Sequence, residues 1–261
     1  MKRTSRFRPH GILLGLVLVV GAPMMATLGS PVGSSAALGA PVVVTHRPLQ
    51  SINATYTLNW AGYVAKTAHY TSVSASWVQP AVKCGANNEY VAAFWVGLDG
   101  GKSGDNSVEQ TGTEAICFFG LLTVYTAWYE MYPAAQSPYS NTVAAGDRMN
   151  ASVTVSGSTY TLTIRDTTRG WTRKTVRTAS DQDATAEVIA EAPATISNGK
   201  IAILPLADFG RVTFIGATVN GSSLAASHPA QLTMAAANGT VKALASPISG
   251  GGNFTVGWEH S

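Results

Sequence analysis

Short runs of β-forming residues between turn signals recur along most of this chain, and they constrain its fold more than any other feature. Three Asn-Gly dipeptides, at 198–199, 220–221 and 238–239, are strong hairpin-turn signals. Strand-like runs occupy residues 73–78, 90–96, 122–129, 149–155, 160–165, 171–177, 186–191, 200–204, 211–215, 231–234 and 253–258. Short strands at this spacing predict an all-β fold, a β-sandwich of two antiparallel sheets in a single domain.

The charge distribution argues against nucleic acid and anionic membranes as partners. The formal net charge of the whole chain is +3, but four basic residues and no acidic ones lie in residues 1–40. Taking these four from the 17 basic residues leaves 13 against 14 acidic residues, a net charge of −1. A domain of this charge has no basic patch.

The first 40 residues have the pattern of a secretory signal peptide. Basic residues from Lys2 to Arg8 precede an apolar run at 12–20, and small residues follow. The run is too short for a comfortable membrane span, although an uncleaved anchor remains the alternative. We therefore expect a secreted, extracellular protein, with residues 41–52 as a linker or short pro-segment and 53–261 as the folded domain.

Export also makes a disulfide between the only two cysteines, Cys84 and Cys117, the natural expectation.

Familiar catalytic motifs are absent from the sequence. It contains no G-x-S-x-G, no H-E-x-x-H and no paired C-x-x-C, so serine-hydrolase and common zinc sites lack support. We expect no metal and no cofactor. The histidines (His10, His46, His69, His228 and His260) are scattered, and we interpret those beyond the signal peptide as ordinary surface or core residues.

Carboxylates and one amide remain as candidates for chemistry. Gln110 stands among small residues, although its amide has four hydrogen-bonding sites to satisfy. If residues 186–191 form a strand, Glu187 and Glu191 point to the same face. The alternative is an edge strand with two solvated glutamates, and the residues alone do not choose between Glu187 and Glu191. Glu130 is a third candidate, because it is surrounded by aromatic residues.

Seven short motifs, in order, resemble those of the glutamic peptidases, the eqolisin family of acid proteases. They are Asn59-Trp60-Ala61-Gly62-Tyr63, Trp77-Val78-Gln79-Pro80, Trp95-Val96-Gly97-Leu98-Asp99-Gly100, Gln110-Thr111-Gly112, Ala127-Trp128-Tyr129-Glu130-Met131-Tyr132-Pro133, Ala186-Glu187-Val188-Ile189-Ala190-Glu191 and Ala207-Asp208-Phe209-Gly210-Arg211-Val212-Thr213-Phe214. Together they cover roughly residues 59–258. Each motif alone is weak, but seven in register are specific.

The resemblance implies a concanavalin A-like, lectin-like jelly roll with the site on a concave sheet. It implies a secreted acid endopeptidase, insensitive to pepstatin, that acts on polypeptides as a monomer and needs no cofactor. The catalytic pair falls on Gln110 and on Glu191, the second acid of its motif. Substrate-site residues carry over to Trp60, Trp95, Asp99 and Glu130.

Such a pair suits amide hydrolysis, which needs a base to activate water and a donor to stabilise the oxyanion. Glu191 would take a proton from water and return it to the leaving amine, while Gln110 would orient the water and donate to the oxyanion. Because the base is a carboxylate that must also act as an acid, we expect an acidic working pH.

Two positions depart from the family pattern. Val188 stands where the family usually has Trp, and strand alternation places it on the face opposite Glu191. Glu114 stands where the family has Asp, so its longer side chain is expected to alter subsite preference or the support of Gln110.

Two other functions fit the same architecture. One is a non-catalytic lectin-like module, with Trp60, Trp128 and Tyr129 stacking on sugar rings. The other is a glycoside hydrolase, which would need Glu187 or Glu130 as a second acid beside Glu191.

Overall fold

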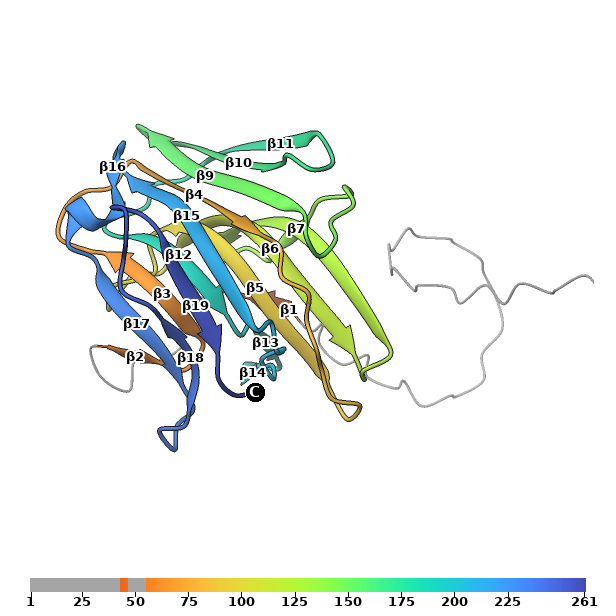
Figure 1. Ribbon diagram of the computed structural model, residues 1–261. Coiled ribbons are helices and arrows are strands. Elements are labelled where there is room, and N and C mark those ends of the chain that lie inside the picture. The colour runs from red at the N-terminus through yellow and green to blue at the C-terminus, as the bar shows by residue number, and fades with distance from the viewer. Residues whose placement is uncertain (1–42, 47–54) are drawn as a thin grey trace, which may run out of the picture. The chain divides into compact units, whose positions relative to one another are not determined.

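The computed structural model describes residues 43–46 and 55–261 (Figure 1). These residues belong to one compact unit, Gly39–Ser261. The predicted signal peptide, residues 1–40, lies outside the described residues, and the predicted pro-segment, 41–52, is described only over 43–46. Both remain predictions.

Strands make up nearly all of the regular structure. They are β1 Val43–Thr45, β2 Tyr56–Thr57, β3 Trp60–Ala65, β4 Ser72–Val78, β5 Glu89–Leu98, β6 Val108–Phe118, β7 Leu122–Tyr132, β8 Ser137–Pro138, β9 Arg148–Ser156, β10 Thr159–Asp166, β11 Trp171–Thr178, β12 Ala186–Glu191, β13 Ala194–Ser197, β14 Lys200–Ile203, β15 Arg211–Val219, β16 Ser222–Ser223, β17 Ala230–Ala235, β18 Val241–Ala245 and β19 Phe254–Trp258. One short 3₁₀ helix, Leu224–Ser227, accompanies them. The all-β prediction is confirmed.

The strands form two layers that face each other (Figure 1). One layer has the order β11-β10-β9-β4-β15, and the other has the order β3-β12-β5-β6-β7. Strands β19, β18 and β17 carry the hydrogen bonding from one layer to the other, so the two sheets are joined along one side. All of these pairings are antiparallel, as predicted for the sandwich. A separate small sheet has the order β1-β13-β14.

The main core lies between the layers. In β9 buried and exposed residues alternate, as expected of a strand with one face in water. Trp77 of β4 is fully buried, and its indole N–H donates across the core to Thr113 Oγ1 of β6 at 3.1 Å. By contrast β12 is buried along its whole length, because it lies between β3 and β5 and both of its faces are covered. Strand β11 ends the first layer and is its edge strand.

The first two Asn-Gly dipeptides form the expected turns. Asn198-Gly199 (φ 50° and 71°) joins β13 to β14, and Asn220-Gly221 (φ 49° and 74°) joins β15 to β16. Both residues of each pair adopt the left-handed conformation that a type I′ hairpin turn requires.

The predicted disulfide joins Cys84, in the loop before β5, to Cys117 near the end of β6. Their Cα atoms are 6.3 Å apart, and the bridge closes a loop of 33 residues. It therefore ties together the two neighbouring strands that carry Trp95 and Gln110.

Replacing both cysteines with serine should lower the free energy of unfolding by about 3–4 kcal/mol, because the unfolded chain regains the entropy of the open loop. Urea unfolding at a fixed acidic pH measures this change, with reduced wild-type protein as the matched control. An unfolding free energy equal to that of the oxidised wild type would contradict the prediction.

Candidate active site

Five adjacent strands present one face on which the predicted residues gather. Glu191 of β12 lies opposite Trp60 of β3 and Ala93 of β5. Two strands on, Gln110 of β6 lies opposite Gly97 of β5 and Glu130 of β7. The intervening Val188 and Ala190 of β12 point the other way, into the main core, as strand alternation predicts.

Two glycines make room for Trp95 on this face. A Cβ atom at Gly112 would lie 2.4 Å from the Cβ of Trp95 and 2.3 Å from the carbonyl oxygen of Phe94. At Gly97 it would lie 2.9 Å from the Trp95 ring and 3.1 Å from the Cβ of Gln110. The indole of Trp95 can therefore reach across the sheet towards Glu191.

The carboxylate of Glu191 is fully buried and held by three side chains. The indole N–H of Trp95 donates to its Oε2 at 2.7 Å, and the amide of Asn59 donates to its Oε1 at 3.0 Å. The third partner is His46, whose Nδ1 lies 3.1 Å from Oε2. Burial raises the pKa of Glu191 above its ordinary value, although the charge and hydrogen bond of His46 and the hydrogen bond of Trp95 act in the opposite direction.

The side-chain amide of Gln110 is buried as well, and its orientation is set by Glu130. Gln110 Nε2 donates to Glu130 Oε2 at 3.0 Å, and it lies 3.5 Å from the backbone carbonyl oxygen of His46. Within the described residues Gln110 Oε1 has no hydrogen-bond partner, which is rare for a buried amide. The amide thus directs a free acceptor and an N–H donor into the same region.

Glu130 receives two hydrogen bonds on one oxygen. Besides Gln110, the backbone N–H of His46 donates to its Oε2 at 3.3 Å. Burial raises the pKa of Glu130 to about 7, against the lowering effect of His46. Glu130 therefore gains its proton well above the pH at which an exposed glutamate does.

His46 lies between Glu191 and Gln110, so its interpretation as an ordinary histidine was wrong. Its ring stacks on Trp128, with centroids 4.0 Å apart and planes within 7°, and it is fully buried. The position of this histidine in an apparent linker carried no signal that it would enter the site.

The hydrogen bonds of His46 indicate an imidazolium. Its Nε2 lies 2.8 Å from Gln136 Oε1, an acceptor whose orientation is fixed because Gln136 Nε2 donates to Glu114 Oε1 at 2.8 Å. The other nitrogen faces the Glu191 carboxylate, so both ring nitrogens are donors. Burial lowers the pKa of His46, but the charge and hydrogen bond of Glu191 and the charges of Glu130 and Glu114 raise it to about 9.

Three of the four predicted substrate residues lie at this site. Trp95 and Glu130 contact the pair as described, and Trp60 packs edge-on against Trp95 at 4.8 Å between ring centroids. Asp99 is placed differently. It is buried at φ 63° in the turn after β5, and its carboxylate accepts hydrogen bonds from the backbone N–H groups of 182, 183 and 184. These contacts hold a loop, and Asp99 as a substrate residue remains a prediction.

Sequence reasoning missed Asn59, His46 and Gln136 at this site. Asn59 had a signal, because it begins the first motif of the resemblance. Glu114, which stands where the family has Asp, was expected to affect Gln110 or a subsite. In the structure its carboxylate accepts hydrogen bonds from Thr126 Oγ1, at 2.9 Å, and from Gln136.

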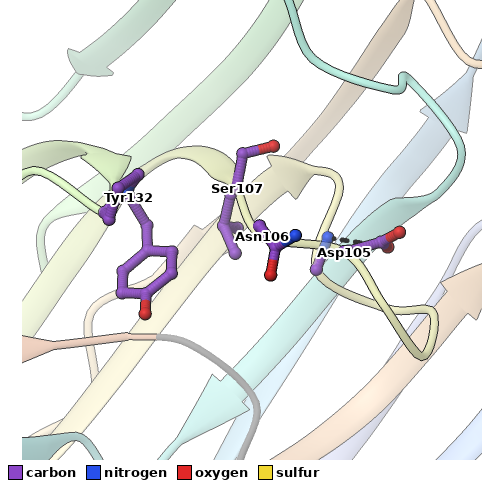
Figure 2. Close-up of a pocket in the computed structure, with 7 residues that line it drawn as sticks. Asp105, Asn106, Ser107 and Tyr132 are labelled. Carbon is purple, nitrogen blue, oxygen red and sulfur yellow. Dashed lines mark hydrogen bonds between the residues drawn. The ribbon is translucent and has the colours of Figure 1, made fainter.

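A pocket of about 270 Å³ extends the site along β6 and β7 (Figure 2). It is lined by Gly100, Asp105, Asn106, Ser107, Val108, Tyr132 and Pro133. Val108 and Tyr132 lie opposite each other, two residues from Gln110 and Glu130 respectively and on the same face. In Figure 2 Tyr132 stands on one side, with Asp105, Asn106 and Ser107 in a row on the other.

A second group of buried acids lies around Glu187, four residues before Glu191. Burial raises the pKa of Glu187 well above its ordinary value, a hydrogen bond with Thr185 lowers it, and the charges of Asp99, Asp105 and Glu109 raise it further. Burial and the charges of Asp181 and Asp99 raise the pKa of Glu109 to about 10. Glu109 is therefore protonated in the folded protein at neutral pH, and Glu187 keeps its proton to a higher pH than an exposed glutamate does.

Comparison with known proteins identifies the family of this chain. Residues 58–258 match the model of the Peptidase A4 family. Aspergillopepsin-2 of Aspergillus niger is 29% identical over 194 residues, which span 66% of this chain and 68% of the relative. Scytalidopepsin B of Scytalidium lignicola is 32% identical over 128 residues, 47% of this chain and 46% of the relative.

Solved structures show the same architecture. Scytalido-glutamic peptidase with a transition state analog inhibitor superposes with a TM-score of 0.66 at 24% identity, over 77% of this chain and 98% of that one. Aspergilloglutamic peptidase from Aspergillus niger gives 0.54 at 30% identity, over 65% and 99%. The β-sandwich prediction is confirmed by these likenesses.

The fold and these matches together define a glutamic peptidase. The chain belongs to the Peptidase A4 family and is an enzyme that hydrolyses peptide bonds. This assignment replaces the two carbohydrate-directed alternatives. Within the described ranges, 43–46 and 55–261, no helix is long and apolar enough to cross a membrane.

The buried acids predict that the fold is most stable in acid. Glu187 and Glu109 have folded-state pKa values above the ordinary 4.5, so the stability that they contribute is present below pH 4.5 and is lost as the pH rises. Each such group costs about 1.4 kcal/mol per pH unit while it stays protonated only in the folded state. The midpoint of thermal unfolding should therefore fall between pH 4 and pH 8.

The variants Glu187→Gln and Glu109→Gln should each flatten this pH dependence, because a neutral amide has no proton to lose. The matched control is Glu259→Gln, at an exposed position, which should leave the slope unchanged. A wild-type midpoint that rises or stays level from pH 4 to pH 8 would refute the explanation.

Proposed function

We propose that this enzyme is a secreted acid endopeptidase that acts as a monomer with Glu191 and Gln110 as its catalytic pair. The observation that carries the proposal is that both side chains contact the same residue, His46. Gln110 Nε2 lies 3.5 Å from the carbonyl oxygen of residue 46, and the Glu191 carboxylate lies against the side chain of the same residue.

Glu191 acts as the base and then as the acid. Its carboxylate accepts a proton from a water molecule, whose oxygen attacks the carbonyl carbon of the substrate peptide bond. The protonated Glu191 then gives this proton to the amide nitrogen as the carbon–nitrogen bond breaks. Burial favours this exchange because it raises the pKa of Glu191, which brings the proton affinity of the carboxyl closer to that of the reacting groups.

Gln110 stabilises the charge that develops during the attack. Its unpartnered Oε1 accepts a hydrogen bond from the attacking water, and its Nε2 donates to the oxyanion. Glu130 is a positioning residue, because its hydrogen bond with Gln110 Nε2 fixes which end of the amide points where. Trp95 and Asn59 hold the Glu191 carboxylate in the same way.

Extended substrates fit the shape of the site. The pocket beside Val108 and Tyr132 continues the row of Gln110 and Glu130, so it is a subsite for residues beyond the cleaved bond. Because no aspartate pair takes part in this mechanism, pepstatin should not inhibit the enzyme.

The pair is tested with single variants and a denatured protein substrate at pH 3–4. Glu191→Gln should abolish cleavage because it removes the base, and Gln110→Ala should lower kcat by roughly 10²–10³-fold because it removes one oxyanion donor. Circular dichroism should show an intact fold in both.

The matched control is Glu187→Gln, which changes a buried glutamate on the same strand and face. It should keep activity at pH 3–4, and pepstatin should leave both it and the wild type active. Full activity in Glu191→Gln, or its loss in Glu187→Gln alone, would show that the pair is misassigned.

A further inference from the structure

β-Sheet pairing places residues 43–46, which precede the predicted domain, next to the catalytic pair. Strand β1 runs antiparallel to β13, with Thr45 opposite Ala194. Because β13 follows Glu191 after only Ala192 and Pro193, this register places residue 46 beside Glu191. The segment therefore occupies the face of the sheet that the mechanism reserves for substrate.

His46 contacts the catalytic pair and its positioning residue Glu130. Its Nδ1 lies 3.1 Å from Glu191 Oε2, its backbone N–H donates to Glu130, and its carbonyl oxygen faces Gln110. The ring is stacked on Trp128 and is held at its far nitrogen by Gln136. A histidine in a solvent-exposed linker would not have this many hydrogen-bonding and stacking partners.

We propose that the cleft contains a binding pocket for an imidazolium side chain, formed by Trp128, Gln136, Glu114 and Glu191, and that His46 of the chain's own N-terminal segment fills it as an intramolecular inhibitor. The proposal rests on the catalytic role given to Glu191 and Gln110. It assigns the segment around residues 43–46 the function of a pro-segment, which the sequence left open.

Inhibition follows from the atoms that His46 occupies. Nδ1 takes the Glu191 oxygen that would otherwise accept a proton from water, so the base is blocked. The ring also fills the space between Glu191 and Gln110. The carbonyl of residue 46 can face Gln110 without being attacked, because its own side chain excludes the water.

Charge gives the contact a dependence on pH. Three carboxyl groups face the His46 ring, those of Glu191 on β12, Glu130 on β7 and Glu114 on β6. The ring is protonated below about pH 9, so the attraction is strongest while Glu191 is ionised. As the pH falls through the raised pKa of Glu130, the imidazolium loses this anionic partner and the segment is released. Acid thus removes the inhibitor in the range where the peptidase is expected to work.

The first test compares full-length wild type with His46→Ala at pH 6, using an internally quenched peptide. The wild type should show a lag, and the initial rate of His46→Ala should be about tenfold higher without a lag, which corresponds to a free cleft in about one wild-type molecule in ten. The matched control is His260→Ala, an exposed histidine, which should behave like the wild type. Equal initial rates and no lag in wild type and His46→Ala would overturn the proposal.

The second test adds the segment back in trans. Acetyl-Val-Val-Thr-His-amide, the sequence of residues 43–46, should inhibit His46→Ala at pH 6 and lose potency at pH 3.5. The same peptide with Ala in place of His should be without effect at ten times the concentration. Equal inhibition by the two peptides, or by neither, would show that the pocket does not select an imidazole.

A third measurement does not depend on hydrolysis. In the full chain, the imidazole proton resonances of His46 should titrate at about 9 in the wild type and clearly lower in Glu191→Gln, where the anionic partner is gone. A titration near 6.5 in both proteins would overturn the proposal. If the wild type and His46→Ala cleave no peptide at any pH while this shift is observed, the catalytic assignment fails and the occupied pocket stands.

Discussion

The rest of the site depends on the burial of the Glu191 carboxylate and on the hydrogen bonds that compensate for it. Strand β12 is covered on both faces and lies between β3 and β5, and Glu191 is fully buried. A buried carboxylate is costly unless donors replace its hydration. Trp95 and Asn59 supply two of these donors, and Trp95 is accommodated because Gly97 leaves room for its ring and Gly112 for its Cβ. One buried charge therefore explains residues on two strands and one loop, namely β5, β6 and the loop before β3.

The second layer of the sandwich makes this arrangement rigid. Val188 and Ala190 pack into the main core while Ile189 and Glu191 face the site, so any shift of β12 would disturb both sides. Strands β19, β18 and β17 join the layers along one side, and the disulfide fixes β6 to the loop before β5. A reaction that relies on preorganised hydrogen-bond donors, as proposed for Gln110, benefits from such a frame.

The strands and the candidate pair could be predicted from the sequence, because strands, turns and short motifs are recognised from residues that are close together in the chain. Alternation and Asn-Gly turns identify strands, and the short motifs place Gln110 and Glu191. Strand alternation also predicts correctly that Val188 avoids the site. The contacts of His46, Gln136 and Asp99 could not be predicted in this way. They depend on which distant segments the sheet brings together, and a lone histidine in a linker looks the same whether it lies in water or is stacked on Trp128. The choice of Glu191 over Glu187 came from the resemblance, since both share a face and both are buried.

The pairing of β1 with β13 determines which residue of the N-terminal segment lies beside Glu191. Because side chains alternate along a strand, sliding β1 by one residue would turn the position of His46 to the other face and put Thr45 in its place. The number of residues between Val43 and His46 therefore matters as much for the contact with Glu191 as the identity of the histidine. Val44 and Thr45 can change to other strand-forming residues and His46 would still contact Glu191. One inserted or deleted residue would keep the same side chains but would move His46 away from Glu191.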